Sequence, residues 1–177
     1  NVQEVMDLSP VAHLAALSGK VPFINFFDGF RTSHEIQKIA VWDYEDLKDM
    51  CDMDAVAEFR KHALNPEHPH MRGSHENGDI FFQHREACNK YYAELPAVVE
   101  KHMDKINAKL GTDYKLFNYY GHPEADRVII AMGSICDVAE EVIDYLNAHG
   151  EKVGLVKVRL FRPFAAEKLV EAIPATC

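Results

Sequence analysis

The sequence has no lysine-rich or arginine-rich run, and its net charge is −9 over 177 residues. Nucleic acids and anionic membrane surfaces attract basic patches, so this balance argues against both as partners. No apolar run approaches the roughly 20 residues needed to cross a bilayer. The first residues, NVQEVMDLSP, lack an initiator Met and the basic-then-apolar pattern of a secretory signal, and they resemble the start of an internal fragment.

Closely spaced cysteines are also missing, because no C-x-x-C pair occurs anywhere in the chain. Zinc and iron–sulfur sites are usually built from such pairs, so we expect no metal or cluster here. We interpret the thiols as reduced and the compartment as cytosol-like. The four cysteines are Cys51, Cys88, Cys136 and Cys177.

Histidines gather in and beside the loop predicted for residues 65–79: His68, His70, His75 and His84. Neutral imidazoles bind zinc well, which makes a metal site one interpretation. No cysteine and no ordered carboxylate spacing completes such a site. A solvated histidine-rich loop without metal is therefore the prediction.

The stretch VPFINFFDGFRTSHEIQKI is the one around which the rest of the chain is organised. Val21–Phe27 is apolar except for Asn25, which is typical of a strand buried on both faces. Asp28-Gly29 ends the strand, and Ile36 and Ile39 predict a helix capped by Thr32 or Ser33. Ligands of open α/β sheets bind beyond the carboxyl ends of strands.

The polar cluster after this strand supplies the active-site-proximal candidates Asp28, Arg31, Thr32, His34 and Glu35. An arginine can hold a carboxylate through two hydrogen bonds, a threonine can hold a carbonyl oxygen, and the His-Glu pair could relay protons. The alternative is a capped helix start, with the arginine paired to the aspartate and the histidine on the surface.

One helix is predicted over residues 2–17, interrupted at Ser9-Pro10 and ended by Gly19. Another is predicted over residues 84–110, broken at Pro96 and stopped by Gly111. Residues 43–59 are rich in acids, which indicates either a partner-docking surface or a solvated helix face. Residues 114–123 form a linker or edge piece that contains the domain boundary, and two compact lobes should meet near Tyr119–Pro123. This piece is too rich in aromatics, Tyr114 among them, for a free linker, so it should pack on a domain face.

The last third shows a βαβα pattern: strand 127–132, helix 135–149, strand 153–160 and helix 166–173. The crossover makes the two strands parallel. Gly133 and Ser134, at the turn before the helix, are a possible anion site for a phosphate, or simply a tight turn. Arg159 and Arg162 are interface candidates that could form salt bridges to the first domain or contact a ligand.

Three stretches resemble pyruvate:ferredoxin (flavodoxin) oxidoreductase, in that family's order: FFDGFRTSHEIQKI, RGSHENGDIFFQHREACNKYY and DRVIIAMGSICDVAEEVIDYLNAHGEKVGLVKVRLFRPF. The resemblance implies an α/β fold class, with the end of a thiamine-diphosphate-binding-type α/β domain followed by a truncated transketolase C-terminal-like βαβ domain. Residues 1–118 would be the C-terminal part of the pyrimidine-side domain plus a helical linker. Residues 119–177 would belong to the second domain.

The resemblance also implies a function as part of the larger enzyme: oxidative decarboxylation of pyruvate to acetyl-CoA and CO2. Electrons would pass to ferredoxin or flavodoxin. The full-length enzyme would be a homodimer with thiamine diphosphate, Mg2+, [4Fe–4S] clusters and coenzyme A, whose phosphate is a candidate for the Gly133-Ser134 turn. Its location would be cytoplasmic, or alternatively a hydrogenosome-type organelle.

The catalytic residues are unknown from this sequence, which has no GDG…N thiamine-diphosphate motif and no G-x-G-x-x-G. We expect the 177 residues alone to bind no cofactor and to be inactive. Two alternatives remain: another 2-oxoacid:ferredoxin oxidoreductase, or a non-catalytic α/β interaction module.

Overall fold

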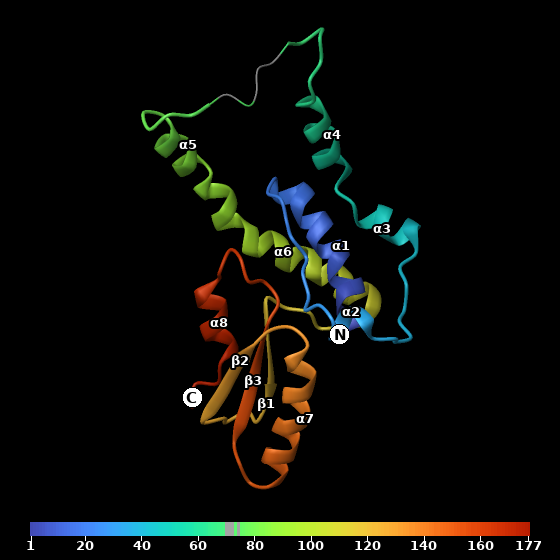
Figure 1. Cartoon of the computed structure of the whole chain (residues 1–177), viewed down its shortest axis with the longest axis vertical. Coiled ribbons are helices and arrows are strands. Elements are labelled where there is room, and N and C mark those ends of the chain that lie inside the picture. The colour runs from blue at the N-terminus through green and yellow to red at the C-terminus, as the bar shows by residue number, and fades with distance from the viewer. Residues whose placement is uncertain (70–72, 74) are drawn as a thin grey trace.

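The computed structural model describes residues 1–69, 73 and 75–177, and for Arg31 only the backbone. Two long helices, α1 (Val2–Gly19) and α6 (Asn89–Leu110), lie against each other at the centre of the molecule (Figure 1). Four short helices connect them: α2 (Arg31–His34), α3 (Tyr44–Met50), α4 (Met53–Lys61) and α5 (Phe81–Ala87). The α4 and α5 helices extend away from the rest of the chain as two arms.

The α1 helix runs unbroken past Pro10, so the predicted interruption is wrong. Proline has no N–H, which leaves the carbonyl four residues earlier without its helical donor. The indole Nε1 of Trp42 donates to that carbonyl, on Met6, at 3.2 Å. A residue 32 positions away in the sequence therefore replaces the missing hydrogen bond, and local patterning does not predict this.

The α6 helix also continues through its proline, Pro96, and the chain instead breaks between α5 and α6 at Cys88. The predicted stop at Gly111 is confirmed, because this glycine adopts φ 72° at the C-cap. A positive φ costs glycine little, which is why helices commonly end on it.

Val21–Phe27 is not a strand, and this prediction is wrong. Phe23 packs against the main core, but Ile24 is 84% exposed and Phe26 and Phe27 are also exposed. A strand needs a neighbour to pair with, and none of the described residues pairs with this segment. Its composition is that of a buried strand, yet the part of the chain that the structure describes holds no partner for it.

The helix predicted from Thr32 or Ser33 through Ile39 is also wrong. Only Arg31–His34 are helical, and the chain turns to extended backbone at Glu35. The Ile36 side chain is fully exposed, so the apolar spacing of this segment finds no surface to pack on. Helices this short depend on tertiary packing, which is absent around Ile36.

The sheet has three strands: β1 (Phe117–Gly121), β2 (Arg127–Ala131) and β3 (Val153–Val158), in the order β1-β3-β2. The parallel pair β2–β3 and the intervening α7 (Ile135–Ala148) confirm the predicted βαβ unit. The last helix, α8 (Ala166–Ala172), is also confirmed. β1 was predicted only as a linker or edge piece, and it is an edge strand antiparallel to β3.

Helices cover both faces of this sheet (Figure 1). On one face, Leu155 of β3 packs with Cys136 and Ile143 of α7. On the other, Val156 joins the main core, which includes buried residues of α1 and α6 and half-buried residues of α8. Successive side chains of β3 point to opposite faces of the sheet, so α7 packs on one face and the helical half of the chain packs on the other. The fold class is α/β with a small mixed sheet.

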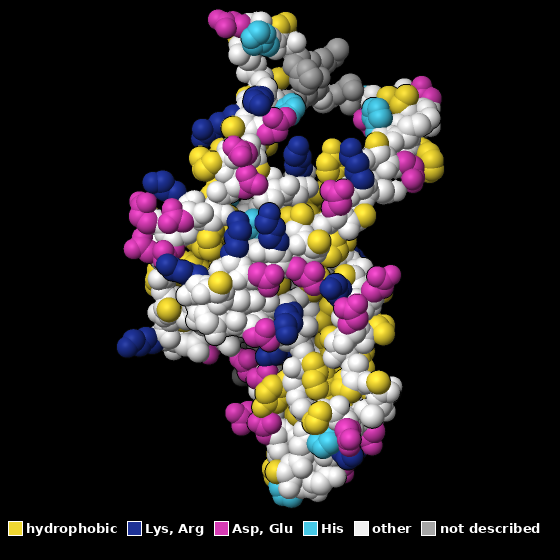
Figure 2. Space-filling view, turned by 180° about the vertical axis from the view of Figure 1, so that it is seen from behind, with side chains coloured by type: hydrophobic (Ala, Val, Ile, Leu, Met, Phe, Trp, Pro, Cys, Tyr) yellow, Lys and Arg dark blue, Asp and Glu magenta, His cyan; other side chains and the backbone are white. Residues whose placement is uncertain are grey.

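Figure 2 shows hydrophobic side chains at the surface, both on the arms and at the sheet-bearing end. Within the described part of the chain, no helix combines the length and the apolar character needed to span a membrane. The division into residues 1–118 and 119–177 stays a prediction; it falls within β1.

Candidate functional site

The parallel strands β2 and β3 end at the same edge of the sheet, and a pocket of about 330 Å³ with both apolar and polar walls lies there. We call it the junction pocket. Open α/β sheets bind ligands at this edge. Its walls come from α1, the segment 24–32, the turn between β2 and α7, and the residues after β3. The polar side chains that line it are Asn1, Glu4, Asn25, Asp28, Thr32, Ser134 and Arg159.

Asp28 connects two of the candidate groups taken from the sequence. Its Oδ2 accepts from the Thr32 hydroxyl at 2.8 Å and from the Ser134 hydroxyl at 2.9 Å. Its Oδ1 accepts from the Ser134 backbone N–H at 3.3 Å. Asp28 and Ser134 are 106 residues apart, so the fold alone brings the loop candidates and the turn candidates together.

The hydrogen bonds from the Thr32 and Ser134 hydroxyls lower the pKa of Asp28. The carboxylate also faces the N-terminus of α7, where unpaired N–H groups favour negative charge. Gly133 permits this turn because its φ is 83°. In the structure, the anion at the Gly133-Ser134 turn is therefore the chain's own carboxylate.

The other candidates of the loop do not join this cluster. His34 is exposed, and its Nδ1 lies 2.6 Å from the carbonyl oxygen of Phe30. Glu35 is exposed at the end of α2. Thr32, by contrast, is buried. The side chain of Arg31 lies outside the described residues, so its predicted pairing with Asp28 stays a prediction.

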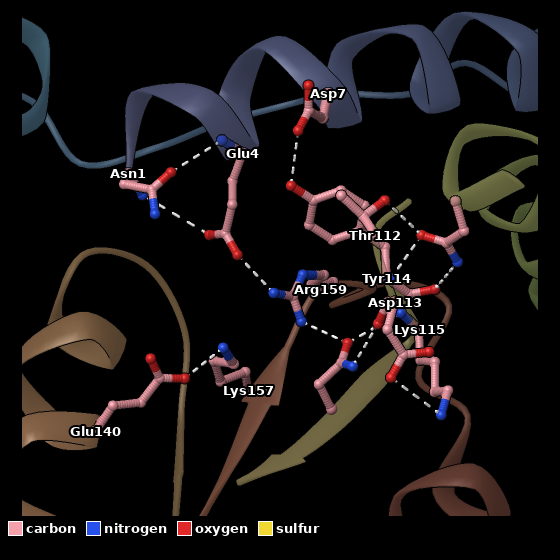
Figure 3. Close-up of polar contacts among 12 residues, drawn as sticks. Asn1, Glu4, Asp7, Thr112, Asp113, Tyr114, Lys115, Glu140, Lys157 and Arg159 are labelled. Atoms are coloured by element: carbon pink, nitrogen blue, oxygen red, sulfur yellow. Dashed lines mark hydrogen bonds and ion pairs between the residues drawn. The ribbon is translucent and has the colours of Figure 1, made fainter. Parts of the chain in front are cut away.

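Arg159, at the end of β3, connects the sheet to α1 (Figure 3). Its side chain is 9% exposed, with one guanidinium nitrogen 2.5 Å from Glu4 Oε1 and another 2.5 Å from Asn118 Oδ1. The guanidinium also lies over the Tyr114 ring, 5.0 Å from its centroid. The Tyr114 hydroxyl in turn donates to Asp7 of α1 at 2.8 Å.

This network sets the charge state of its members. Burial alone would raise the pKa of Glu4, but the charge of Arg159 and its hydrogen bond outweigh burial and lower it. Burial and the hydrogen bond to Asp7 raise the pKa of the Tyr114 hydroxyl far above its usual range. Glu4 is therefore ionised and Tyr114 neutral at physiological pH, which keeps the ion pair intact.

Arg162 lies elsewhere. It is exposed and stacks on the neighbouring Phe161 ring, 4.4 Å from the centroid. It lines a second pocket of about 690 Å³, which is mostly apolar and lies between α1, α6 and the segment 21–26. Of the two interface candidates, Arg159 reaches α1, whereas Arg162 contacts its own neighbour.

The residues described here do not fit a metal or cluster site. Among residues 1–69, 73 and 75–177, no group of three or more potential ligand side chains lies together. The two acids of the junction pocket already bind the chain's own donors. His70 of the histidine-rich loop lies outside the described residues. We therefore derive no chemical step through Mg2+, thiamine diphosphate or an iron–sulfur cluster from these side chains.

Comparison with known proteins assigns both halves of the chain. A family model described as pyruvate flavodoxin/ferredoxin oxidoreductase, thiamine diphosphate-binding, matches residues 1–104. A second, described as pyruvate:ferredoxin oxidoreductase core domain II, matches residues 125–176. The chain belongs to the pyruvate flavodoxin/ferredoxin oxidoreductase family. The junction pocket therefore lies between two regions that this family's models describe separately.

Curated relatives agree with the family models. Pyruvate-flavodoxin oxidoreductase of Enterobacter agglomerans is 60% identical over 98% of this chain. Pyruvate:ferredoxin oxidoreductase of Moorella thermoacetica is 57% identical over 99%. Pyruvate dehydrogenase [NADP(+)] of Cryptosporidium parvum is 50% identical over 99%. The chain spans only 15% of the length of the first two relatives and 9% of the third.

A solved structure of 2-oxoglutarate:ferredoxin oxidoreductase from Magnetococcus marinus is 25% identical in sequence. The match covers 64% of this chain and 19% of that one, with a TM-score of 0.38. A score this low does not establish a shared arrangement of the whole chain.

Sequence reasoning missed Glu4, Asn118 and Tyr114, which hold Arg159. Glu4 reads as an ordinary first-turn acid of α1. Tyr114 was one of several aromatics expected to pack on a domain face. The only available signal was the need of a half-buried arginine for an acid, which does not say which acid.

Proposed function

We propose that these 177 residues are part of a pyruvate:ferredoxin or pyruvate:flavodoxin oxidoreductase. The whole enzyme converts pyruvate and coenzyme A to acetyl-CoA and CO2 and passes the electrons to its acceptor. The observation that carries the proposal is the succession of two family matches, residues 1–104 and 125–176, in one chain. Relatives named for pyruvate support the choice of substrate.

The proposed role of this part is to join two regions rather than to carry the chemistry. The junction pocket lies at the carboxyl edge of β2 and β3, with the Asp28–Ser134 hydrogen bond on one side and the Arg159–Glu4 ion pair on the other. Its acids are occupied by the chain's own donors. The catalytic and cluster-binding residues then belong to other parts of the enzyme, and thiamine diphosphate supplies the carbanion chemistry when bound there.

We also propose that residues 119–177 form part of a transketolase C-terminal-like domain, a proposal that the βαβ unit β2–α7–β3 supports. Mg2+, [4Fe–4S] clusters, coenzyme A, a homodimeric assembly and a cytoplasmic location belong to the same proposal and rest on the family resemblance. The acceptor is the least constrained part, since relatives carry the names of flavodoxin, ferredoxin and NADP+.

Substrate preference tests this proposal. The complete gene product, purified without oxygen, is supplied with coenzyme A and a low-potential acceptor. We expect pyruvate to be oxidised with a higher kcat/KM than 2-oxoglutarate or 2-oxobutyrate. A preference for either of the longer acids would assign the protein to another 2-oxoacid oxidoreductase.

A further inference from the structure

At the junction pocket, two polar ties cross from the region matching the thiamine diphosphate-binding model to the region matching core domain II, one on each side of the pocket. Away from the pocket, Lys168 also lies 3.5 Å from Glu100. The Arg159–Glu4 pair is largely buried. The second tie, Asp28 to Ser134, is exposed and is made by a segment with no regular structure of its own. This segment is therefore the more easily displaced wall of the pocket.

The hydrogen bonds of Asp28 hold the backbone around it in one conformation. Among the described residues, Thr32 and Ser134 direct three hydrogen bonds to the carboxylate, and these use both of its oxygens. Between Asp28 and Thr32, Phe30 adopts φ 58° and ψ −73°, which is unfavourable for a residue with a side chain. Such a conformation persists where surrounding contacts fix it, and here the Asp28–Thr32 bond closes the turn.

The tie also completes α7. Ser134 precedes the first turn of this helix, and its hydroxyl donates to Asp28 instead of accepting from an N–H of α7. The Asp28 carboxylate takes the place of this missing cap, because its other oxygen accepts the Ser134 N–H and its charge faces the positive end of the helix. The α7 N-terminus and the segment 24–32 therefore depend on the same side chain.

We propose that Asp28 is a positioning residue, whose carboxylate fixes the segment 24–32 of the first region onto the N-terminus of α7 in the second. In this role it does not contact substrate. It holds one wall of the junction pocket and the relative placement of the two regions. The kinetic consequence rests on the proposed function, whereas the structural coupling does not.

Hydrogen exchange in the complete gene product tests the coupling. Asp28→Ala and Ser134→Ala should each accelerate amide exchange in both the first turn of α7 and residues 24–32. A net hydrogen bond is worth roughly a two- to tenfold change in an equilibrium. The double variant should exchange no faster than Asp28→Ala, because that single change already removes the bond that Ser134→Ala removes. Asp28→Asn, which keeps one acceptor oxygen, should restore part of the protection.

Two control variants separate this tie from general effects. Asp137→Ala removes an acid from the same end of α7 and should leave exchange in residues 24–32 unchanged. Asn25→Ala removes a bond from the same segment to Ser9 of α1, and should leave α7 unchanged. If either control reproduces the Asp28→Ala pattern, or if the single effects add in the double variant, the coupling does not exist.

Kinetics test the positioning role. Asp28→Ala should lower kcat for pyruvate and leave KM little changed, with partial recovery in Asp28→Asn. Ser134→Ala should lower kcat less, because the backbone N–H of residue 134 and the Thr32 hydroxyl can still donate to Asp28. Unchanged kcat in both variants would contradict the role. If the wild-type gene product does not oxidise pyruvate at all, the proposed function fails, while the exchange result still decides the coupling.

Discussion

Arg159 connects the end of β3 to α1, to β1 and to the segment that precedes β1. It contacts Glu4 of α1, Asn118 of β1 and the ring of Tyr114, and its backbone N–H donates to Leu116 at 2.9 Å. Because its side chain is 9% exposed, removing it would leave its partners short of a donor. Unpairing a buried charge costs far more than losing an exposed ion pair.

We expect Arg159→Met to destabilise the region around β3 by about 2–4 kcal/mol at neutral pH, since Glu4 would stay ionised without its partner. Hydrogen exchange of the β3 amides measures this. Arg159→Lys should be intermediate, because an ammonium group cannot reach Glu4 and Asn118 with the same planar geometry. Wild-type protection in Arg159→Met would show that the ion pair contributes nothing.

The effect of Arg159→Met should depend on pH, with a sign fixed by Glu4. In the wild type the lowered pKa of Glu4 stabilises the fold above pH about 4.5, and this stabilisation is lost as the pH falls through the folded-state pKa. In the variant, burial still raises that pKa and only the smaller effects of the N-terminal amine and Lys157 oppose it, so the penalty falls as Glu4 becomes protonated. The stability difference between the two proteins should therefore shrink on acidification. Adding Glu4→Gln to the variant should remove this pH dependence.

At the scale of elements, Gly19 shows that a glycine near the end of a helix can be required for packing and not for ending the helix. Gly19 was predicted to end the helix, yet it is helical, and Lys20 takes the left-handed conformation with φ 57°. The reason for Gly19 is packing, because a Cβ there would lie 2.5 Å from Leu95 Cδ1 of α6. The residue that would benefit from being glycine is its neighbour.

Substitutions at these two positions should therefore have opposite signs. Lys20→Gly should stabilise the end of α1 by about 1 kcal/mol, because a left-handed conformation costs other residues roughly that much. Gly19→Ala should destabilise the α1–α6 contact by about 1–3 kcal/mol through overpacking against the buried Leu95. Melting temperatures of both variants and the wild type test this, and a stabilised Gly19→Ala protein would refute the packing explanation.

Elements that form from local pattern were predictable, and those that depend on distant partners were not. The parallel unit β2–α7–β3 follows from apolar runs and Gly turns within 32 residues, Arg127–Val158. The continuity of α1 past Pro10 depends on Trp42, and Val21–Phe27 pairs with no strand among the described residues. For the same reason the sequence supplied Asp28 and Ser134 as separate candidates, but not their contact.

At the scale of the molecule, the exposed apolar surface is large for a chain of this size. Segment 24–30, the arms around α4 and α5, and one side of α7 all expose large hydrophobic side chains (Figure 2). Monomeric soluble proteins rarely leave contiguous apolar patches of this kind uncovered. The chain spans 15% of the length of these two relatives, and we propose that the rest of the enzyme covers this surface.

We expect the 177 residues alone neither to decarboxylate pyruvate nor to show iron–sulfur absorbance. The physical reason is the absence of paired cysteines in the sequence and of any grouped metal ligands in the described part of the chain. Absorbance spectra after anaerobic reconstitution test this. A brown protein whose broad visible band disappears on Cys→Ser substitution would contradict it.

The most direct test of the account is a product measurement on the complete gene product, loaded with thiamine diphosphate and reconstituted without oxygen. Pyruvate, coenzyme A and oxidised flavodoxin or ferredoxin are supplied together, and acetyl-CoA, CO2 and reduced acceptor are measured in the same reaction. The account predicts equal amounts of acetyl-CoA and CO2, with acceptor reduction that stops when coenzyme A is omitted. A folded, cofactor-loaded protein that releases no CO2 from pyruvate would contradict it.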